Sequence, residues 1–424
     1  MRLIFSFIFL ILINLSGGFS NNSDKDTLKI SLKDAEERFL KNNLELLAGK
    51  YNIDIAKAQI LQAKLWANPN ISIEQNAYNQ ETHKYFDISG KGETAINLDQ
   101  LIFLAGKRNK RIRLEKINTQ NTEYDFYDLL RALKYQLRTN FNDLYFLQKN
   151  IEVYEFEIDK LKNLVTLYDI QYHKGNISLK ETTRLKAELF SLENDKKTIL
   201  DSITQKQGII KLMIRDSTSN YIIPLIENLN ADKTDLGNYS ISSLQNIAKE
   251  NRFDLKKYEN MLKWNEANAA LQKSLAVPDL HLFGRYDHAG GYIEDYKALG
   301  IAIDLPVWNR NQGNIQASKY QSDQSKLILQ QFNDQLANDI LQAYSKTYRS
   351  INLYRNIDDQ FIKDFDALIQ GIITNYEKRN ISLLEFIDYY ETYKESKAQM
   401  LQLQNNLLNN LEEINYVTGK NLFN

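Results

Sequence analysis

The chain of 424 residues contains no cysteine, four histidines and four prolines. The missing cysteines exclude disulfides, thiolate metal ligands, a cysteine nucleophile and a lipid-modified N-terminal cysteine. The prolines stand at Pro69, Pro224, Pro278 and Pro306, so long stretches lack the residue that breaks helices most strongly. Very long helices are therefore permitted.

A net charge of one sign is also missing, because 53 Lys and Arg face 54 Asp and Glu. Without a global field, nothing favours nucleic acid as a partner. The sequence contains no Gly-rich phosphate loop, nucleophile elbow or HExxH motif. His281 and His288 are seven residues apart, which places them on opposite faces of a strand and makes them a poor metal pair. We predict no enzyme, no cofactor and no tight metal site.

The N-terminus contains one short hydrophobic run. Arg2 precedes apolar residues from Leu3 to Leu15, and small and then polar residues follow, which is the order of a secretory signal peptide over residues 1–20. Such a run is too short to cross a bilayer as a helix, and an uncleaved anchor is the alternative. No other segment approaches the ~20 apolar residues of a membrane helix, so the exported chain could enter a membrane only as β-strands.

The sequence repeats itself. "YHKGNISLKE" from Tyr172 returns 204 positions later as "YEKRNISLLE" from Tyr376, and "QLIFLAGKR" from Gln100 aligns with "DLPVWNRNQ" from Asp304 at the same offset. Repeats of this length indicate a duplicated structural unit. We predict a signal peptide at 1–20, a first repeat at 21–218, an equatorial linker at 219–240 and a second repeat at 241–424, which together form one intertwined domain.

Each predicted repeat begins with a helix and continues with two short strands. The first helix starts after Ser31, a plausible N-cap, and ends before Pro69. Strand patterns of period two follow at 70–79 and 93–101, and again at 278–287 and 297–304. Their alternate positions form one face, which holds Ile71, Ile73, Ile96, Leu98, Leu280, Leu282, Gly284, Tyr286, Leu299, Ile301 and Ile303.

A long helix follows the strands in each repeat. Apolar residues from Leu144 to Tyr172 alternate three and four positions apart, which is typical of a coiled-coil seam. A helix over residues 106–172 would be ~100 Å long. After the break the seam continues from Leu185 to Ile210, interrupted by Lys196 and Lys206, and the second repeat shows the pattern at Leu336, Ile340, Ile351, Tyr354, Phe361 and Leu368 before its own break.

These parts suggest an oligomer. Four strands cannot close a barrel, since even small membrane barrels need eight, whereas three chains would supply twelve. We therefore expect a mainly α fold with long antiparallel coiled-coil helices, four strands per chain and two internal repeats. Its trimer would form a 12-stranded membrane β-barrel above an α-helical periplasmic tunnel. The alternative is a soluble sheet that caps a helical rod.

Two strand-to-helix junctions, "QLIFLAGKRNKRI" from Gln100 and "DLPVWNRNQGNIQAS" from Asp304, carry a family resemblance. Over essentially the whole mature chain, the sequence resembles the TolC-type outer-membrane efflux proteins, and the junctions look like those of the branch that serves cobalt, zinc and cadmium exporters. The resemblance implies a passive duct in the outer membrane of a Gram-negative-type bacterium, with a periplasmic extension.

The implied partners are two further copies of the chain, outer-membrane lipid, a periplasmic adaptor and, indirectly, a proton-driven inner-membrane pump. The implied cargo is a divalent heavy-metal cation. Drugs, dyes or a secreted polypeptide are alternative cargoes. A secreted coiled-coil scaffold and, lastly, an enzyme are the alternative classes.

The resemblance also implies that the two repeated breaks are turns on which the adaptor docks. Glycine can take a positive φ at a helix end, asparagine tolerates it best among other residues, and serine can cap the returning helix. Because the second copy has Arg379 in place of Gly175, its turn either differs in shape or leaves the positive φ to Asn380. A tight turn without docking is the alternative. The turn residues are Gly175, Asn176, Ile177, Ser178, Arg379, Asn380, Ile381 and Ser382.

Acidic residues follow the second turn. Glu385 and Asp388 are three apart and share a helix face, and by resemblance they ring the periplasmic mouth, where six carboxylates in a trimer would favour cations. An ordinary solvated helix face is the alternative. Glu181 and Tyr376 match a family pair that holds the closed state by a hydrogen bond between neighbouring coils. Ile381 stands where some relatives carry an arginine that strengthens this lock, which leaves the strength of closure open.

Overall fold

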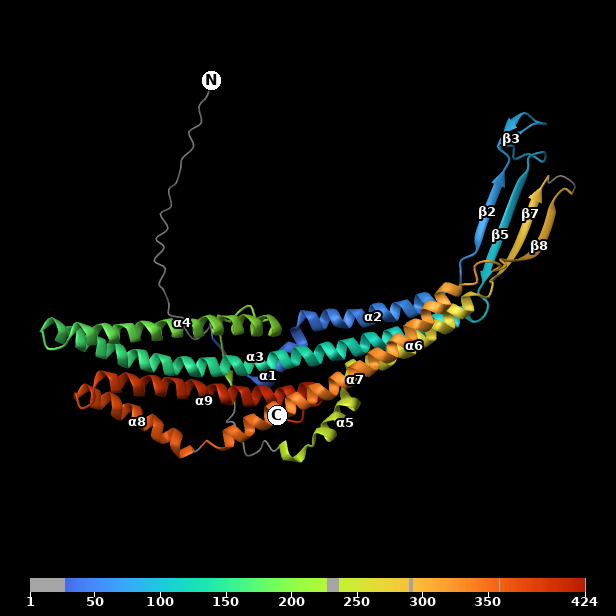
Figure 1. The fold of residues 1–424 in the computed structure, drawn as a ribbon. Coiled ribbons are helices and arrows are strands. Elements are labelled where there is room, and N and C mark those ends of the chain that lie inside the picture. Colours follow the sequence, from blue (N-terminus) through green and yellow to red (C-terminus); the bar gives the residue numbers. More distant parts are fainter. Residues whose placement is uncertain (1–26, 227–235, 290–292, 358, 424) are drawn as a thin grey trace, which may run out of the picture.

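The computed structural model describes residues 27–226, 236–289, 293–357 and 359–423. The predicted signal peptide and residues 227–235 of the predicted linker lie outside this part. The described chain is a long bundle of helices with a β-sheet at one end (Figure 1). No helix within these ranges combines the length and apolarity that crossing a membrane requires.

The first predicted helix is divided in two. Helix α1 (Leu32–Asn42) begins at the predicted cap, where Ser31 Oγ accepts a hydrogen bond from the Asp34 amide. Asn43 then takes an extended conformation and starts α2 (Leu44–Lys64), with its side chain accepting from the Leu46 amide at 3.0 Å. The expectation of one continuous helix is wrong, because this asparagine caps a new helix in mid-pattern.

The second repeat has the same division. Helix α5 (Ile241–Asn251) ends at Arg252, and α6 (Phe253–Leu275) begins after it. Arg252 is extended, as Asn43 is, and its guanidinium pairs with Asp254 at 2.6 Å. Two different residues therefore produce the same bend at matching places.

The four predicted strands form one antiparallel sheet in the order β2 (Asn70–Gln75), β5 (Thr94–Ile102), β7 (Leu280–His288) and β8 (Tyr296–Ile303). The register pairs apolar positions across neighbouring strands. The predicted apolar face is confirmed by three of these pairs: Ile71 with Leu98, Ile96 with Tyr286, and Leu282 with Ile301.

Two smaller sheets were not evident from the sequence pattern. A two-residue pair, β3 (Tyr78–Asn79) and β4 (Lys84–Tyr85), extends the first hairpin. A parallel pair joins β1 (Thr27–Ser31) to β6 (Tyr221–Leu225), and a short 3₁₀ helix, η2 (Leu236–Asn238), follows. Strand β6 lies in a segment whose sequence looks like a loop, and it is held by a long-range partner that no local pattern reveals.

Long helices make up the rest of the chain. Helix α3 (Lys107–His173) has the predicted bounds to within one residue, and α4 (Leu179–Ile214) returns beside it. In the second repeat α7 (Gln312–Arg355) stops and α8 (Asp359–Glu377) restarts before α9 (Leu383–Thr418) returns. The expectation that one helix carries the seam without interruption up to the second turn is wrong, because α7 ends at Arg355 and α8 begins at Asp359. The Asn356 amide donates to the carbonyls of Asn352 and Leu353, which tightens and ends the turn.

The predicted seam of α3 is the core of the bundle. Leu144, Ile151, Ile158 and Leu161 are buried, and α3 packs against α4 and α9. The two lysines that interrupt the returning seam are paired across it: Lys196 with Glu155 at 2.8 Å and Lys206 with Asp143 at 2.7 Å. Their long apolar stems can cover the seam while each charge meets a carboxylate.

Candidate functional site: the helical turns and the two faces of the sheet

The turn between α3 and α4 is fixed by backbone hydrogen bonds. Gly175 has φ +76°, its amide donates to the Tyr172 carbonyl, and the Asn176 amide donates to the Gln171 carbonyl, both at 2.9 Å. This pair of bonds is a Schellman motif, in which a left-handed residue ends the helix. The prediction that Gly175 holds the positive φ is confirmed.

The turn between α8 and α9 has the same backbone bonds. Arg379 takes φ +60°, its amide donates to the Tyr376 carbonyl, and the Asn380 amide donates to the Asn375 carbonyl, again at 2.9 Å. Arginine therefore keeps the left-handed place itself. The proposals that Asn380 takes it, or that the second turn differs in shape, are wrong.

The side chains of Asn176 and Asn380 stabilise the turns through hydrogen bonds to the preceding helices. The Asn176 side chain donates to Gln171 Oε1 at 2.7 Å, and the Asn380 side chain donates to Asn375 Oδ1 at 3.1 Å. Each bond reaches back five residues onto the preceding helix. The asparagines thus brace the turn through side-chain bonds while the preceding residue has the positive φ.

Both returning helices start with a complete capping box. Ser178 Oγ accepts from the Glu181 amide, and Ser382 Oγ accepts from the Glu385 amide. In return, the backbone amides of the serines donate to the glutamate carboxylates at 3.1 and 2.8 Å. The predicted serine caps are confirmed, and the capping role of both glutamates was missed, although the Ser-x-x-Glu spacing indicates it.

The carboxylate of Glu385 is exposed yet restrained by its cap. The amide and hydroxyl of Ser382 hold the pKa of Glu385 below its usual value. Asp388, one turn further along α9, is also exposed. Two solvent-facing carboxylates therefore lie at the start of α9, as the gating prediction requires. Their place at a mouth stays a prediction.

Tyr376 is almost completely buried, with 2% of its surface exposed. Its ring stacks on Phe386 at 4.3 Å and on Tyr168 at 5.5 Å between centroids. Among the described residues its hydroxyl has no hydrogen-bond partner within normal geometry, and burial raises the pKa of this group. The structure thus brings Tyr376 close to the turn that carries Glu385. The proposed bond between Tyr376 and Glu181 of neighbouring coils stays a prediction.

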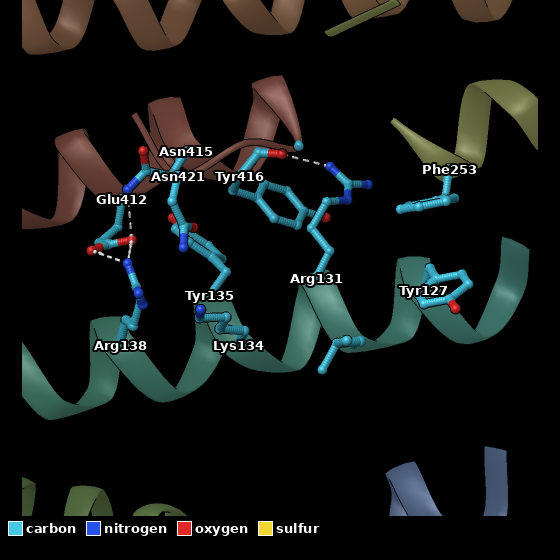
Figure 2. Close-up of a pocket in the computed structure, with 12 residues that line it drawn as sticks. Tyr127, Arg131, Lys134, Tyr135, Arg138, Phe253, Glu412, Asn415, Tyr416 and Asn421 are labelled. Atoms are coloured by element: carbon cyan, nitrogen blue, oxygen red, sulfur yellow. Dashed lines mark hydrogen bonds and ion pairs between the residues drawn. The ribbon is translucent and has the colours of Figure 1, made fainter. Parts of the chain in front are cut away.

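A second cluster, at mid-length of the bundle, was not anticipated from the sequence. Figure 2 shows Arg131 and Arg138 of α3 reaching toward the last turns of α9 beside an open cavity of about 190 Å³. Arg138 binds Glu412 at 2.9 Å, and Arg131 donates to the Tyr416 carbonyl at 2.7 Å. Tyr135 stacks on the Tyr416 ring at 4.7 Å. These bonds tie the last helix of the second repeat to the first repeat.

On β2, β5 and β7, the face opposite the apolar one is mostly polar. A cavity of about 310 Å³ on this face is lined by Ser72, Glu74, Asn97, Asp99 and Arg285, together with Ala95 and Phe283. His281 Nδ1 lies 2.9 Å from Asp99, and Arg285 pairs with Asp287 at 3.0 Å. His288 instead pairs with Asp295, also at 2.9 Å. The two histidines do not come together, and within the described ranges no three His, Asp or Glu side chains could hold a metal ion.

Comparison with known proteins agrees with this architecture. Residues 37–210 match the family of outer membrane efflux proteins. No curated protein matches the chain in sequence. The family match falls on the first repeat and contains α2, the β2 and β5 strands and α3.

Solved channels share the fold over nearly the whole chain. The structure of CusC, described for its transmembrane channel formation, has a TM-score of 0.74 at 15% identity and covers 92% of both chains. The CmeC outer membrane channel of Campylobacter jejuni has a TM-score of 0.75 at 14% identity, over 93% of this chain and 87% of its own. The outer membrane protein VceC of Vibrio cholerae has a TM-score of 0.71 at 14% identity, over 92% and 97%.

The mostly helical fold of the described chain is that of solved outer-membrane channels, and residues 37–210 are similar to the family of outer membrane efflux proteins. The cation-efflux branch is a finer distinction, which neither finding addresses.

Proposed function

We propose that the chain is the outer-membrane duct of a tripartite efflux pump. The observation that carries this proposal is the apolar face of the sheet, which is exposed in the single chain: Ile71 is 63%, Ile301 68% and Leu299 93% exposed. A continuous exposed apolar surface marks an interaction site. Lipid on this face, with a polar opposite face, is the arrangement of a membrane barrel wall.

The sheet also has open edges. Strands β2 and β8 are its outermost members, and each pairs on one side within the described residues. Each strand of the sheet runs antiparallel to its neighbour, so β8, the fourth strand, runs antiparallel to β2, the first. The β8 strand of one copy can therefore pair with the β2 strand of the next in a homotrimer, which gives twelve strands and leaves no free edge.

Below the sheet, α3 alone has 67 residues and a length of ~100 Å. Three copies of the bundle would continue the barrel as a helical tunnel into the periplasm. The turns at Gly175 and Arg379 then lie at its far end, where we place the docking of a periplasmic adaptor that links the duct to a proton-driven inner-membrane pump.

For the cargo we propose divalent heavy-metal cations. Glu74, Asp99 and Asp287 carry carboxylates on the polar face of the sheet, and Glu385 and Asp388 carry them beside the second turn. Rings of carboxylates favour cations over anions. The cation is a transient cargo here, so a tight binding site is not needed.

A growth assay tests the cargo. The gene is deleted, and growth is measured across zinc, cobalt, cadmium, copper and silver and across a panel of dyes and antibiotics, with the restored gene as control. We expect sensitivity confined to divalent metals. Sensitivity to organic compounds alone would contradict the cation assignment and leave the duct in place, and no sensitivity at all would count against an export function.

A further inference from the structure

A carboxylate is buried inside the helical bundle where no channel function requires one. Glu157 of α3 is 0% exposed, and neither of its carboxylate oxygens has a hydrogen-bond partner among the described residues. It lies on the helix between Tyr154 and Ile158, which belong to the apolar cluster shared by α3, α4, α8 and α9. An ionised carboxylate without partners is very unfavourable in such a place.

The groups that face Glu157 come from two other helices. From α9, the Tyr390 hydroxyl donates its hydrogen bond to the backbone carbonyl of Glu157 at 2.6 Å, and therefore not to the carboxylate. Lys394 of α9 is 14% exposed and lies 3.9 Å from Asp195 of α4. One oxygen of Glu188 on α4 is also buried without a hydrogen-bond partner in the part of the chain that the structure describes. Further titratable groups in or beside this cluster are Tyr154, Glu391, Tyr393 and Glu395, with Tyr168 and Tyr376 nearer the turns.

This environment favours the neutral form of the acid. Burial raises the pKa of Glu157 to about 8, Lys394 opposes this increase, and Glu188 adds to it. Burial raises the pKa of Glu188 as well. Since the folded-state pKa of Glu157 exceeds the ordinary value of 4.5, the stability that its proton provides is complete below pH 4.5 and is lost as the pH rises to about 8.

We propose that Glu157 is a proton-binding site that holds α9 against α3 and α4, and that loss of this proton loosens the seam. One helix joins the site to the proposed mouth, because α9 carries Tyr390 and Lys394 at the buried acid and Glu385 and Asp388 at its exposed start. This inference rests on the proposed function in one respect: a looser α9 is expected to favour an open periplasmic mouth at alkaline pH.

Thiol labelling tests the seam directly, because the natural chain has no cysteine. Leu192 of α4 is 0% exposed in the same cluster. The full chain with Leu192→Cys is labelled with a maleimide between pH 6 and pH 9, alone and together with Glu157→Gln. The ratio of the two rates cancels the intrinsic pH dependence of the thiol. At pH 6 we expect Leu192→Cys to be labelled at the same rate with Glu157 and with Glu157→Gln. At pH 9, where most Glu157 side chains have lost their proton, we expect labelling to be about fivefold faster in the chain that keeps Glu157.

Glu152→Gln is the matched control, because Glu152 is an exposed glutamate on the same helix and pairs with Lys149 of that helix, not across the seam. Combined with Leu192→Cys, this control variant should be labelled at the same rate as Leu192→Cys alone at every pH. A ratio for Glu157→Gln that does not change with pH would overturn the proposal. Should Leu192→Cys fail to fold, thermal unfolding of the cysteine-free chain replaces it. The midpoint should then fall between pH 5 and pH 8 in the natural chain and much less in Glu157→Gln, and equal falls would overturn the site.

Thiol labelling and thermal unfolding need only folded protein, so their results do not depend on whether the chain forms a duct. Conductance in planar bilayers tests the link to the mouth. We expect the conductance of the natural chain to rise from pH 6 to pH 9 and that of Glu157→Gln to stay flat. A pH-dependent seam with a conductance that does not differ between the two chains would overturn the link to the mouth.

Discussion

The two helical turns have the same backbone and different residues at its critical position. Gly175 and Arg379 both have positive φ, and both donate their amides to a tyrosine carbonyl 2.9 Å away. A left-handed conformation costs a non-glycine residue about 1 kcal/mol. That the second turn keeps its shape with arginine shows that the Schellman bonds and the serine caps define the turn, and that glycine only makes it easier.

The turns differ more in what surrounds them. After the second turn, Phe386 is buried and stacks on Tyr376, which in turn stacks on Tyr168 of α3. At the matching places of the first repeat stand Tyr172, which is half-buried, and the small Thr182. Stacked rings therefore connect the second turn to α3, and the first turn has no matching stack at these two positions.

The largest effect should follow from bulk at the first turn. Gly175→Trp is expected to abolish export and leave the trimer level unchanged, because a side chain at Gly175 would meet nothing within 4 Å and would project from the proposed docking surface. Growth under the exported toxin and the amount of trimer in the membrane are the measurements.

Gly175→Ala is the matched control for this change. It imposes the same positive φ on a side chain that is too small to project from the turn. Export should survive in this variant. A fully active Gly175→Trp protein, or an equal loss in both variants, would remove the docking assignment.

Charge at the second turn should have the next largest effect. Glu385→Gln together with Asp388→Asn is expected to move the reversal potential in a salt gradient toward zero, since two carboxylates per chain are lost. The helix should stay capped, because glutamine also serves at this position of a capping box. Glu181→Gln is the control, because it removes one carboxylate at the first turn and leaves Glu385 and Asp388 at the second turn in place. A reversal potential that does not change in the double variant would count against the ring.

The caps should contribute equally at the two turns. Ser178→Ala and Ser382→Ala should each lower the free energy of unfolding by about 1 kcal/mol, because each removes one acceptor for a helix amide. Denaturant unfolding of the purified protein measures both. A loss confined to one serine would show that the two turns are less alike than their hydrogen bonds indicate.

The smallest effect concerns the left-handed position itself. Arg379→Gly should stabilise the chain by less than about 1 kcal/mol, because relief of the positive φ is partly offset by the freedom of glycine in the unfolded state. Gly175→Ala should destabilise the chain by a similar amount. Denaturant unfolding checks both. Destabilisation by Arg379→Gly would mean that the arginine side chain supports the turn.

Local patterns predicted the parts of this fold that local physics determines. The seam of α3, the alternating strands and the cap at Ser31 depend on spacings of two to four residues, which the sequence displays. The bend at Asn43 and strand β6 depend on distant partners, such as the Met213 carbonyl and strand β1, and were missed.

The same distinction holds for the candidate site. The turns and their serine caps could be located from the repeat alone. Glu157 could not, because its burial is set by α4 and α9, and on its own helix it looks like any surface glutamate.

The central claim is that this chain forms a trimeric outer-membrane duct. The most direct test is to separate the membranes of cells that express the chain, extract it from the outer-membrane fraction with detergent and measure its mass. The account predicts a complex of three copies that requires detergent to stay in solution. A monomer that is released with the periplasmic contents and stays soluble without detergent would contradict the account and favour a coiled-coil scaffold.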